Sequence, residues 1–515
     1  MTPSGHVRLD GTLLAMDIGT THCKAGLFDL RGRTLSIASR PMQTRQPTGY
    51  PITFDPDALW ESMKALIQQV TQDAPGRVLA VGITSMAETG LIIDRATGQA
   101  MSPMLPWFDN STQPQAERIA AEENAEAFYL KTGVQMRYKC TPAKLLWVKQ
   151  HHPQVFDHAS APMWLGTADI IAYWLTGAAG TDYSLAGRTG AFDINRKQWD
   201  DAWLRRWELS ADLFPQALPG GTSVGESLPQ WGALGIPAGT PVAVSGHDHL
   251  CAVLGAGAVD AETIFDSMGT AEVLIGNFPQ RALTSADYAS GLSTGCHAAS
   301  GWMYWLGSMS TSGGSIEWIR QLFNNETLTY HELTGLLQQA RSTPTGILFM
   351  PHLLGSGAPH SDSRMRGAWV GLKSQHGCAD LAKAVLEGTA YEAELMRRAG
   401  EAMTGQSITM LTAAGGGTRN PIWMQIKADV CGCPIRILEE PEAALVGAAR
   451  SAAEGSGIPC DFQPAASTVI EPDMQRHVLY RELFEEGYQT LFEPLRRISH
   501  LAVLDRIDHL DADGI

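Results

Sequence analysis

The chain has 515 residues, a length that exceeds one hydrophobic core and predicts two or three domains. Its formal charge of -16 argues against binding to nucleic acid or to an anionic membrane surface, because both are polyanions. The first ten residues are polar and no apolar run approaches the roughly 20 residues of a membrane span, so we expect a cytoplasmic protein without signal peptide or membrane segment. The eight cysteines are scattered, which predicts free, mostly buried thiols.

The first apolar segments predict a β-hairpin. Residues 13–16 form one strand, Asp17-Ile-Gly-Thr-Thr21 forms the turn, and residues 24–28 return. Glycine and hydroxyl residues at this turn expose backbone N–H groups, which suits a phosphate. A plain hairpin turn needs the same residue types, so that alternative stays open.

Strands and helices then alternate along the chain. Strands are predicted over residues 78–83 and 90–94. Helices are predicted over residues 55–72, 114–131, 142–151 and 162–176. Strands followed by helices, repeated, are typical of an α/β fold.

The segment Ser245-Gly-His-Asp-His-Leu250 joins a strand-like run, 240–245, to a small-residue helical pattern, 251–256. A carboxylate on such a turn can take a proton from a substrate hydroxyl, which makes Asp248 a candidate general base. One alternative is an acidic residue that merely stabilises a helix N-terminus. Another is a hydrolase in which His247 and His249 bind a metal, but the sequence offers no further partner cluster.

The second half of the chain begins with another predicted hairpin. Residues 263–268 and 271–275 are its strands, and Gly269-Thr270 is its tip. This hairpin echoes the first one, and two such hairpins suggest duplicated domains that face each other across a nucleotide.

A glycine-rich turn follows later in this half. After a strand over 409–414, Gly415-Gly-Gly417 has no side chains, Asn420 caps a helix that begins at Pro421, and Gly432 can end that helix. Glycines let the backbone approach a flat ligand or a phosphate, although a tight strand-to-helix turn is the simpler alternative. Residues 475–498 form a closing helical pattern.

In this order, these segments resemble the FGGY carbohydrate kinases of the actin-like ATPase superfamily. The resemblance covers about residues 11–495 and rests on five motifs: Asp17-Ile-Gly-Thr-Thr21, Thr141-Pro-Ala-Lys-Leu-Leu-Trp147, Gly246-His-Asp-His249, Asp266-Ser-Met-Gly-Thr270, and Gly415-Gly-Gly-Thr-Arg-Asn-Pro-Ile-Trp-Met-Gln-Ile-Lys-Ala-Asp429. It implies an α/β fold of two ribonuclease-H-like domains with a central cleft. Residues 1–258 would hold the sugar and the catalytic base, residues 259–515 would hold the nucleotide, and the last helices would pack back on the first domain.

The resemblance also implies an ATP-dependent kinase with Mg²⁺ as cofactor and a small sugar as substrate, and it allows a homodimer. Asp248 matches the general base, and Asp17 matches a carboxylate near Mg²⁺. The residues implied on the nucleotide side are Gly19, Thr20, Thr21, Lys24, Gly269, Thr270, Gly415, Gly416, Gly417 and Asn420.

On the sugar side, the resemblance implies contacts from Glu88, Thr89, Trp107 and His249, although Trp107 is alternatively a core residue. Ala87 stands where glycerol kinases have an arginine that contacts glycerol, and Ser111 replaces another family arginine. A ketose or a longer polyol is therefore a more natural substrate than glycerol. The competing hypothesis is a non-catalytic actin-like sensor, which loss of Asp17 or Asp248 would mark; both are present.

Overall fold

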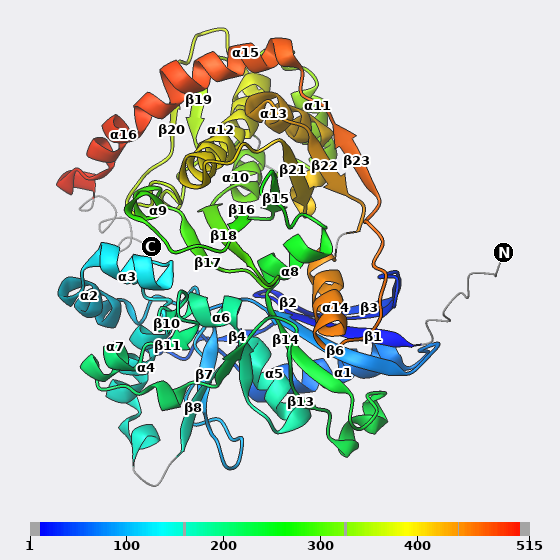
Figure 1. Cartoon of the computed structure of the whole chain (residues 1–515). Coiled ribbons are helices and arrows are strands. Elements are labelled where there is room, and N and C mark those ends of the chain that lie inside the picture. Colours follow the sequence, from blue (N-terminus) through cyan, green and yellow to red (C-terminus); the bar gives the residue numbers. More distant parts are fainter. Residues whose placement is uncertain (1–10, 158–160, 324–326, 441, 505–515) are drawn as a thin grey trace, which may run out of the picture.

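The computed structural model describes residues 11–157, 161–323, 327–440 and 442–504. The chain forms two lobes, each built on a β-sheet with flanking helices (Figure 1). In this view the first lobe, blue to green, lies below the second, green to red. The expected α/β fold is confirmed. The first ten residues, for which we expect no signal peptide, lie outside the described residues, and no described helix is long and apolar enough to cross a membrane.

The first lobe is organised around a six-stranded sheet with the order β13-β14-β6-β1-β2-β3. Its strands are β1 (Thr12–Ile18), β2 (His22–Asp29), β3 (Thr34–Pro41), β6 (Val78–Ser85), β13 (Ser223–Glu226) and β14 (Pro241–His247). β1 and β2 form the predicted hairpin, with Asp17 opposite Lys24. β1, β6 and β14 run parallel, so their carboxyl ends bring Asp17, Ser85 and His247 to one edge of the sheet.

The helices of the first lobe are α1 (Pro56–Thr71), α2 (Gln113–Glu122), α3 (Ala125–Thr132), α4 (Thr141–His151), α5 (Thr167–Thr176), α6 (Tyr183–Arg188), α7 (Asp201–Arg206) and α8 (Asp248–Gly255), with 3₁₀ turns η1 (Pro153–Phe156), η2 (Ala211–Leu213) and η3 (Pro229–Leu234). Short strands complete this lobe: β4 (Thr44–Arg45), β5 (Thr53–Phe54), β7 (Gly90–Asp94), β8 (Pro162–Gly166), β9 (Gly180–Asp182), β10 (Phe192–Asp193), β11 (Gln198–Trp199) and β12 (Gln216–Leu218). The helix predicted over 55–72 is confirmed as α1, where the Asp55 side chain caps the first turn.

Two helix predictions in this lobe are wrong in part. The predicted helix 114–131 is two helices, because the Asn124 side chain accepts a hydrogen bond from the Ala127 N–H and starts α3 anew. The predicted helix 162–176 begins as strand β8, which pairs antiparallel with β7, and only Thr167–Thr176 is helical. The buried residues Met163, Trp164 and Leu165 suit a buried strand as well as a helix, so periodicity alone could not separate the two.

The second lobe is built on a seven-stranded sheet with the order β17-β18-β16-β15-β21-β22-β23. The strands of this lobe are β15 (Thr263–Met268), β16 (Glu272–Pro279), β17 (Ser293–Cys296), β18 (Trp302–Met309), β19 (Leu348–Met350), β20 (Ala368–Val370), β21 (Met410–Ala414), β22 (Ile435–Leu438) and β23 (Ser467–Ile470). β15 and β16 confirm the second predicted hairpin, and β15 runs parallel to β21. The tips of the hairpin and of β21 therefore lie at the same edge of this sheet.

The helices of the second half are α9 (Ser285–Ala289), α10 (Gly313–Leu322), α11 (Tyr330–Leu337), α12 (Cys378–Thr404), α13 (Pro421–Cys431), α14 (Ala443–Gly455), α15 (Met474–Glu482) and α16 (Phe492–Ser499). The closing helix predicted over 475–498 is a distorted helical run, because a π turn, η5 (Leu483–Gly487), and a 3₁₀ turn, η6 (Tyr488–Leu491), separate α15 from α16. α15 packs on α13 of its own lobe.

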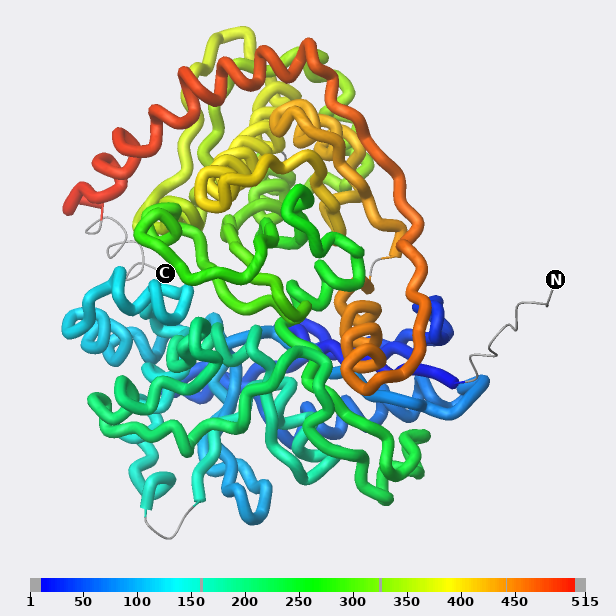
Figure 2. The backbone as a smooth tube through the Cα atoms, viewed as in Figure 1, coloured from blue at the N-terminus to red at the C-terminus, as the bar shows by residue number. Residues whose placement is uncertain are grey.

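One late helix crosses to the first lobe. α14 packs against α8, β1, β6 and β14, and Figure 2 shows this orange segment descending to the blue strands and returning. The approach is close: a Cβ added at Gly447 would lie 1.8 Å from the Cys251 carbonyl oxygen, and one added at Gly255 would lie 2.0 Å from that of Ala443. α14, which precedes the last helices, is therefore the helix that crosses to the first domain, whereas α15 packs within its own lobe.

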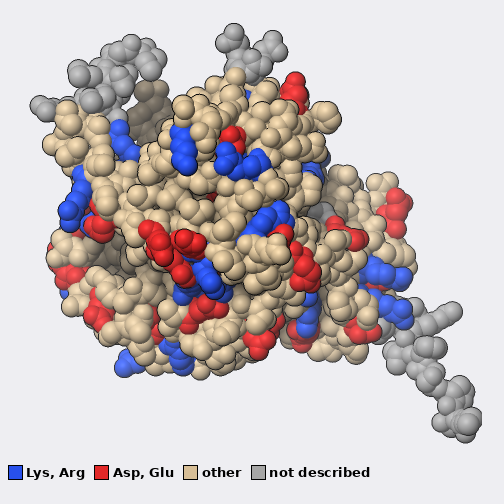
Figure 3. Space-filling view, turned by 90° about the horizontal axis from the view of Figure 1, so that it is seen from above, with Lys and Arg blue, Asp and Glu red and all other residues tan. Residues whose placement is uncertain are grey.

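The thiols follow the sequence expectation, and one face of the surface shows how the charges are distributed. All eight cysteines are free thiols; six are buried and Cys378 is exposed. On the face in Figure 3, acidic and basic side chains of the described residues are interspersed, and no continuous basic surface gathers there. A polyanion would therefore meet both signs of charge on this face.

Candidate active site

Asp248 lies where β14 ends and α8 begins. The strand extends to His247, two residues further than the sequence pattern predicts, and the helix starts at Asp248. Gly246 has a φ of 138°, a conformation that favours glycine, and this bend turns the chain into the helix. The fold therefore places the Asp248 side chain in the first turn of α8, at the carboxyl edge of the sheet.

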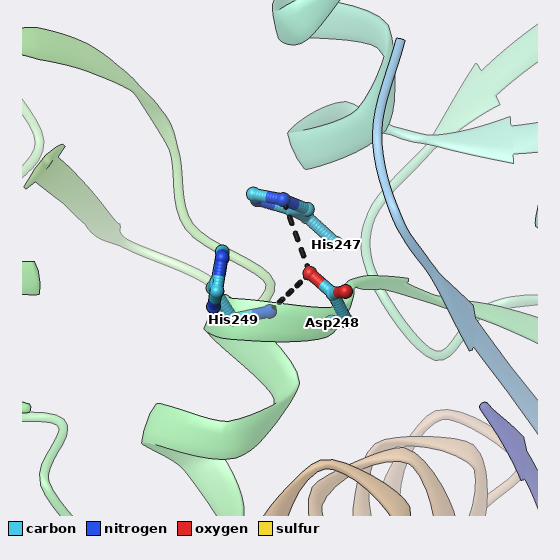
Figure 4. Close-up of side chains that lie close together, drawn as sticks. All are labelled: His247, Asp248 and His249. Carbon is cyan, nitrogen blue, oxygen red and sulfur yellow. Dashed lines mark hydrogen bonds and ion pairs between the residues drawn. The ribbon is translucent and has the colours of Figure 1, made fainter. Parts of the chain in front are cut away.

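Two histidines flank this carboxylate (Figure 4). Asp248 Oδ1 accepts a hydrogen bond of 2.7 Å from the His249 backbone N–H and lies 3.1 Å from His247 Nε2. Burial lowers the pKa of His247 to about 3, so the ring is neutral near pH 7 and its Nε2–H can donate to Asp248. The Nδ1 atom of His247 is buried without a hydrogen-bond partner in the described structure.

The Asp17 carboxylate at the end of β1 lies near Asp248. Burial, followed by the charge of Asp248, raises the pKa of Asp17 to about 8, while Lys24 opposes this shift and Glu442 adds to it. Asp17 Oδ1 is buried and has no hydrogen-bond partner among the described residues. Two neighbouring carboxylates with an unpaired oxygen are a donor set that suits a hard divalent cation such as Mg²⁺.

Lys24 does not point freely to a phosphate. Its Nζ pairs with Glu442 Oε2 at 2.6 Å, which ties β2 to the residue just before α14. The pair is only partly buried. The predicted phosphate contact of Lys24 therefore requires the ammonium group to leave or share Glu442.

Thr20 and Trp107 connect the first hairpin turn to the residues predicted on the sugar side. The Trp107 indole N–H donates to Thr20 Oγ1 at 2.8 Å, and its backbone N–H donates to Thr89 Oγ1 at 3.1 Å. Thr89 is buried, so its hydroxyl supports the backbone of Trp107 rather than standing free for a substrate. Gly19 closes the turn through its N–H, which donates to the His22 carbonyl, and Thr21 is exposed.

Glu88 lies in a cationic cluster that no pattern in the sequence indicated. Its Oε1 accepts from Arg188 Nη2 at 2.5 Å and lies 3.4 Å from Lys139 Nζ. Burial would raise the pKa of Glu88, but Arg188, Lys139 and then Lys144 lower it below its usual range. Glu88 is therefore a charged carboxylate whose Oε1 already has cationic partners.

The backbone of Glu88 is held as firmly as its side chain. Its φ of 61° is uncommon for a residue other than glycine. The ammonium group of Lys144 donates to the carbonyls of Glu88, Leu105 and Pro106, and burial lowers the pKa of Lys144 to about 7. Lys144 belongs to the motif Thr141–Trp147, so the sequence marked this residue without revealing its target; nothing in the sequence marked Arg188.

The second lobe places its two glycine turns side by side. The hairpin tip Gly269-Thr270 is held by the N–H groups of Gly313 and Gly314, which donate to its two carbonyls. A Cβ on Gly415 would lie 2.4 Å from the Met268 carbonyl oxygen, so the residue after β21 must be glycine for the two turns to meet.

The rest of the glycine motif forms a 3₁₀ turn, η4 (Gly416–Arg419), rather than an open loop. Gly416 has open space where a side chain would be, whereas Gly417 packs against Met268 and Trp423. Asn420 caps α13 as predicted, since its side-chain oxygen accepts from the Ile422 and Trp423 N–H groups. Gly416 is therefore the residue of this motif that leaves room for a ligand.

A buried ion cluster joins the two strands of the second hairpin to α13. Lys427 Nζ on α13 lies 2.6 Å from both Asp266 Oδ2 on β15 and Glu272 Oε1 on β16, and all three side chains are 0% exposed. Glu272 Oε2 accepts from Ser312 Oγ at 2.6 Å. Burial and Glu272 raise the pKa of Asp266, and the two carboxylates raise that of Lys427.

We expect Lys427→Met to destabilise the protein by about 3–5 kcal/mol, because it leaves two buried carboxylates without their counter-charge. Urea unfolding monitored by tryptophan fluorescence measures this change. The surface control Lys64→Met, which removes an exposed pair with Glu61, should cost less than about 1 kcal/mol. Adding Asp266→Asn and Glu272→Gln to Lys427→Met should restore stability in part; equal effects of the two lysine changes would contradict the prediction.

The chain matches known proteins over nearly its full length. Residues 12–255 match the FGGY family of carbohydrate kinases, N-terminal domain, and residues 266–455 match its C-terminal domain. The chain is 31% identical over 487 residues to a glycerol kinase from Thermus brockianus, covering 91% of this chain and 96% of that protein. It is 27% identical over 506 residues to a xylulose kinase from Staphylococcus epidermidis, covering 95% and 97%.

The fold agrees with these sequence matches. The crystal structure of xylulose kinase from Rhodospirillum rubrum has a TM-score of 0.86 and 25% identity, and the match covers 95% of this chain and 100% of that chain. The motifs at both hairpins, at Asp248 and at Gly415 thus stand in a chain that matches both domains of one family. The chain therefore belongs to the FGGY family of carbohydrate kinases, ATP-using enzymes that phosphorylate sugars and polyols.

Proposed function

We propose that this kinase transfers the γ-phosphoryl group of ATP to a hydroxyl of a small ketose of the pentulose type, or of a polyol, with Asp248 as the general base. The observation that carries this proposal is the position of Asp248. It lies at the sheet edge beside Asp17, and its two described contacts both fall on Oδ1. Oδ2 is thereby left to accept the proton of a substrate hydroxyl.

The residues around Asp248 hold it in one orientation. The His249 backbone N–H donates to Oδ1, and His247 Nε2 lies 3.1 Å from the same oxygen, so both neighbours restrain the carboxylate. His249 itself is partly exposed beside the base, which supports its assignment to the sugar side. A base that is held in one orientation is already placed for the reaction. Such positioning lowers the barrier to phosphoryl transfer.

We assign the sugar wall to Glu88, Trp107 and His249, with Thr89 and Arg188 as positioning residues. Glu88 Oε1 is held by Arg188, which leaves Oε2 to accept hydrogen bonds from sugar hydroxyls. In this chain the guanidinium beside Glu88 belongs to Arg188 on α6. Glycerol kinases instead have an arginine at the position of Ala87. Burial would lower the pKa of Arg188, but Glu88 and then Tyr304, on β18 of the second lobe, raise it, so this guanidinium lies near both lobes.

We propose that the glycine turns bind the nucleotide and that Asp17 helps to bind the metal. On this proposal residues 1–258 hold the sugar and 259–515 hold most of the nucleotide, with α14 crossing between them. The unpaired buried Oδ1 of Asp17 fits a role in holding Mg²⁺, directly or through its water shell. When bound, Mg²⁺ would neutralise charge on the phosphates of ATP. The backbone N–H and hydroxyl groups at Thr20, Thr21 and Thr270 would position the phosphates.

A coupled assay of ADP release over ketoses, polyols and aldoses tests the proposed function. We expect turnover with at least one ketose or polyol, and slow ATP hydrolysis without any sugar. The competing hypothesis of a non-catalytic sensor predicts that a sugar shifts the thermal unfolding midpoint but releases no ADP. Sugar-dependent stabilisation without turnover across the whole panel would therefore overturn the kinase assignment for this chain.

We expect Glu88→Gln to raise the sugar KM by about 10- to 100-fold and to leave the ATP KM nearly unchanged, because hydrogen bonds to a charged group contribute about 1.5–3 kcal/mol. Glutamine keeps the shape of the side chain, whereas alanine would leave Arg188 buried without its partner. Steady-state kinetics with each substrate varied measures the split. Glu61→Gln, an exposed carboxylate on α1, is the matched control, and a rise in the ATP KM instead would remove Glu88 from the sugar wall.

A further inference from the structure

The cluster around the general base has the composition of a metal site. His247, Asp248 and His249 each offer a ligand atom, and these atoms all lie within 4.8 Å of one another. Figure 4 shows both imidazoles near the carboxylate, on the same side of it. The sequence shows no further partner cluster for the two histidines, whereas the structure places Asp248 itself with them as a third ligand.

The binding capacity of His247 is not used up by the protein. Its side chain is 8% exposed, one ring nitrogen faces Asp248, and the other has no partner among the described residues. A buried polar atom without a hydrogen bond is costly and calls for an explanation.

Access to this cluster is open on one side. The Asp248 side chain is 23% exposed, and His249 is partly exposed on the first turn of α8. The ligand atoms lie within 4.8 Å of one another, whereas neighbouring ligands of a tetrahedral zinc ion are about 3.3 Å apart, so binding requires the partly exposed His249 ring to rotate toward the other two. Three protein ligands would leave a coordination position for water or for an oxygen of the sugar.

We propose that His247, Asp248 and His249 form a binding site for a divalent transition metal ion of the zinc type, and that its occupation switches the kinase off. Two imidazoles and one carboxylate favour Zn²⁺, Co²⁺ or Ni²⁺ over Mg²⁺, which prefers oxygen ligands. The site is thus distinct in chemistry from the one assigned to Mg²⁺ at Asp17. A bound metal ion withdraws electron density from the Asp248 carboxylate and so weakens it as a proton acceptor. The metal site stands without the proposed function; the inhibition rests on it.

Metal binding is tested on the full chain without ATP, which would chelate the metal. All variants carry Cys378→Ser, because this exposed thiol is a competing zinc ligand. Equilibrium dialysis should find one Zn²⁺ per chain at micromolar concentration, and Co²⁺ should give the visible absorption of a four- or five-coordinate site. His249→Gln should weaken binding by at least about tenfold. The exposed control His331→Gln on α11 should leave it unchanged.

The dialysis result decides whether these three residues form a metal site. Stoichiometric Zn²⁺ that persists in His249→Gln, or no binding to the parent chain, would overturn it. Thermal unfolding of each variant followed by circular dichroism establishes that a loss of binding is not a loss of fold.

Kinetics then tests the switch in buffered free Zn²⁺. Inhibition should be competitive with the sugar, unaffected by additional Mg²⁺ and reversed by a zinc chelator, and His249→Gln should need at least about tenfold more Zn²⁺ for the same inhibition. Stoichiometric binding without inhibition would overturn the switch alone. A chain that binds Zn²⁺ but releases no ADP with any sugar would contradict the proposed function and leave the metal site standing.

Discussion

Replacing Asp248 by asparagine should lower turnover by about 10²–10⁴-fold while sugar binding stays within about tenfold of the wild type. The amide keeps the shape of the side chain and can remain beside His247 and His249, but it cannot accept the proton of the sugar hydroxyl. Single-turnover phosphorylation measures the chemical step, and sugar titration followed by intrinsic fluorescence measures binding.

The control for this change is Asp57→Asn. Asp57 also lies in the first turn of a helix, α1, but far along the chain from the sheet edge that carries Asp17 and His247. It should cost a few tenths of a kcal/mol to about 1 kcal/mol of stability through the helix dipole and leave turnover unchanged. A variant at Asp248 that keeps more than a tenth of wild-type turnover would remove this residue from the role of base.

Asp17→Ala should lower turnover by at least about 10–100-fold, the range found when a group that orients a metal ion or its water is lost. The reason differs from that at Asp248, because Asp17 acts on the metal rather than on the proton. Raising Mg²⁺ should therefore partly rescue Asp17→Glu and should not rescue Asp248→Asn. The measurement is the Mg²⁺ dependence of turnover for the three variants, with EDTA as the zero point.

Stability supplies a second readout for Asp17. Its Oδ1 is unpaired, and Asp248 and Glu442 repel its charge, so Asp17→Asn should unfold at a temperature no lower than the wild type. A residue kept only for structure would instead destabilise the fold when changed. Full activity in EDTA, or the same Mg²⁺ response in the variants of both aspartates, would contradict this division of roles.

The sequence by itself determined the parts of the fold that local patterns encode. Both hairpins, α1 with its Asp55 cap and α13 with its Asn420 cap follow from alternation, helical periodicity and capping residues, all of which act within a few positions along the chain. The same holds for Asp248, because a strand pattern that gives way to a helix marks the sheet edge on which ligands bind in α/β folds.

Local patterns were insufficient where a short apolar segment suits either structure. Residues 162–166 became a strand only because β7 lies beside them to complete the hydrogen bonds. The break at Asn124 was readable in principle, since asparagine is a preferred cap, but the helical periodicity on both sides concealed it.

Only the tertiary structure decided the electrostatics of the site. Arg188 meets Glu88 across 100 positions, Lys24 meets Glu442 across 418, and Lys427 meets Asp266 across 161. Such pairs form because burial makes an unpaired charge costly, and the partner is whichever oppositely charged side chain the packing of distant elements brings within reach. The sequence shows the charges and the turns that carry them, whereas their pairing is a property of how α14, α6 and α13 pack on the two sheets.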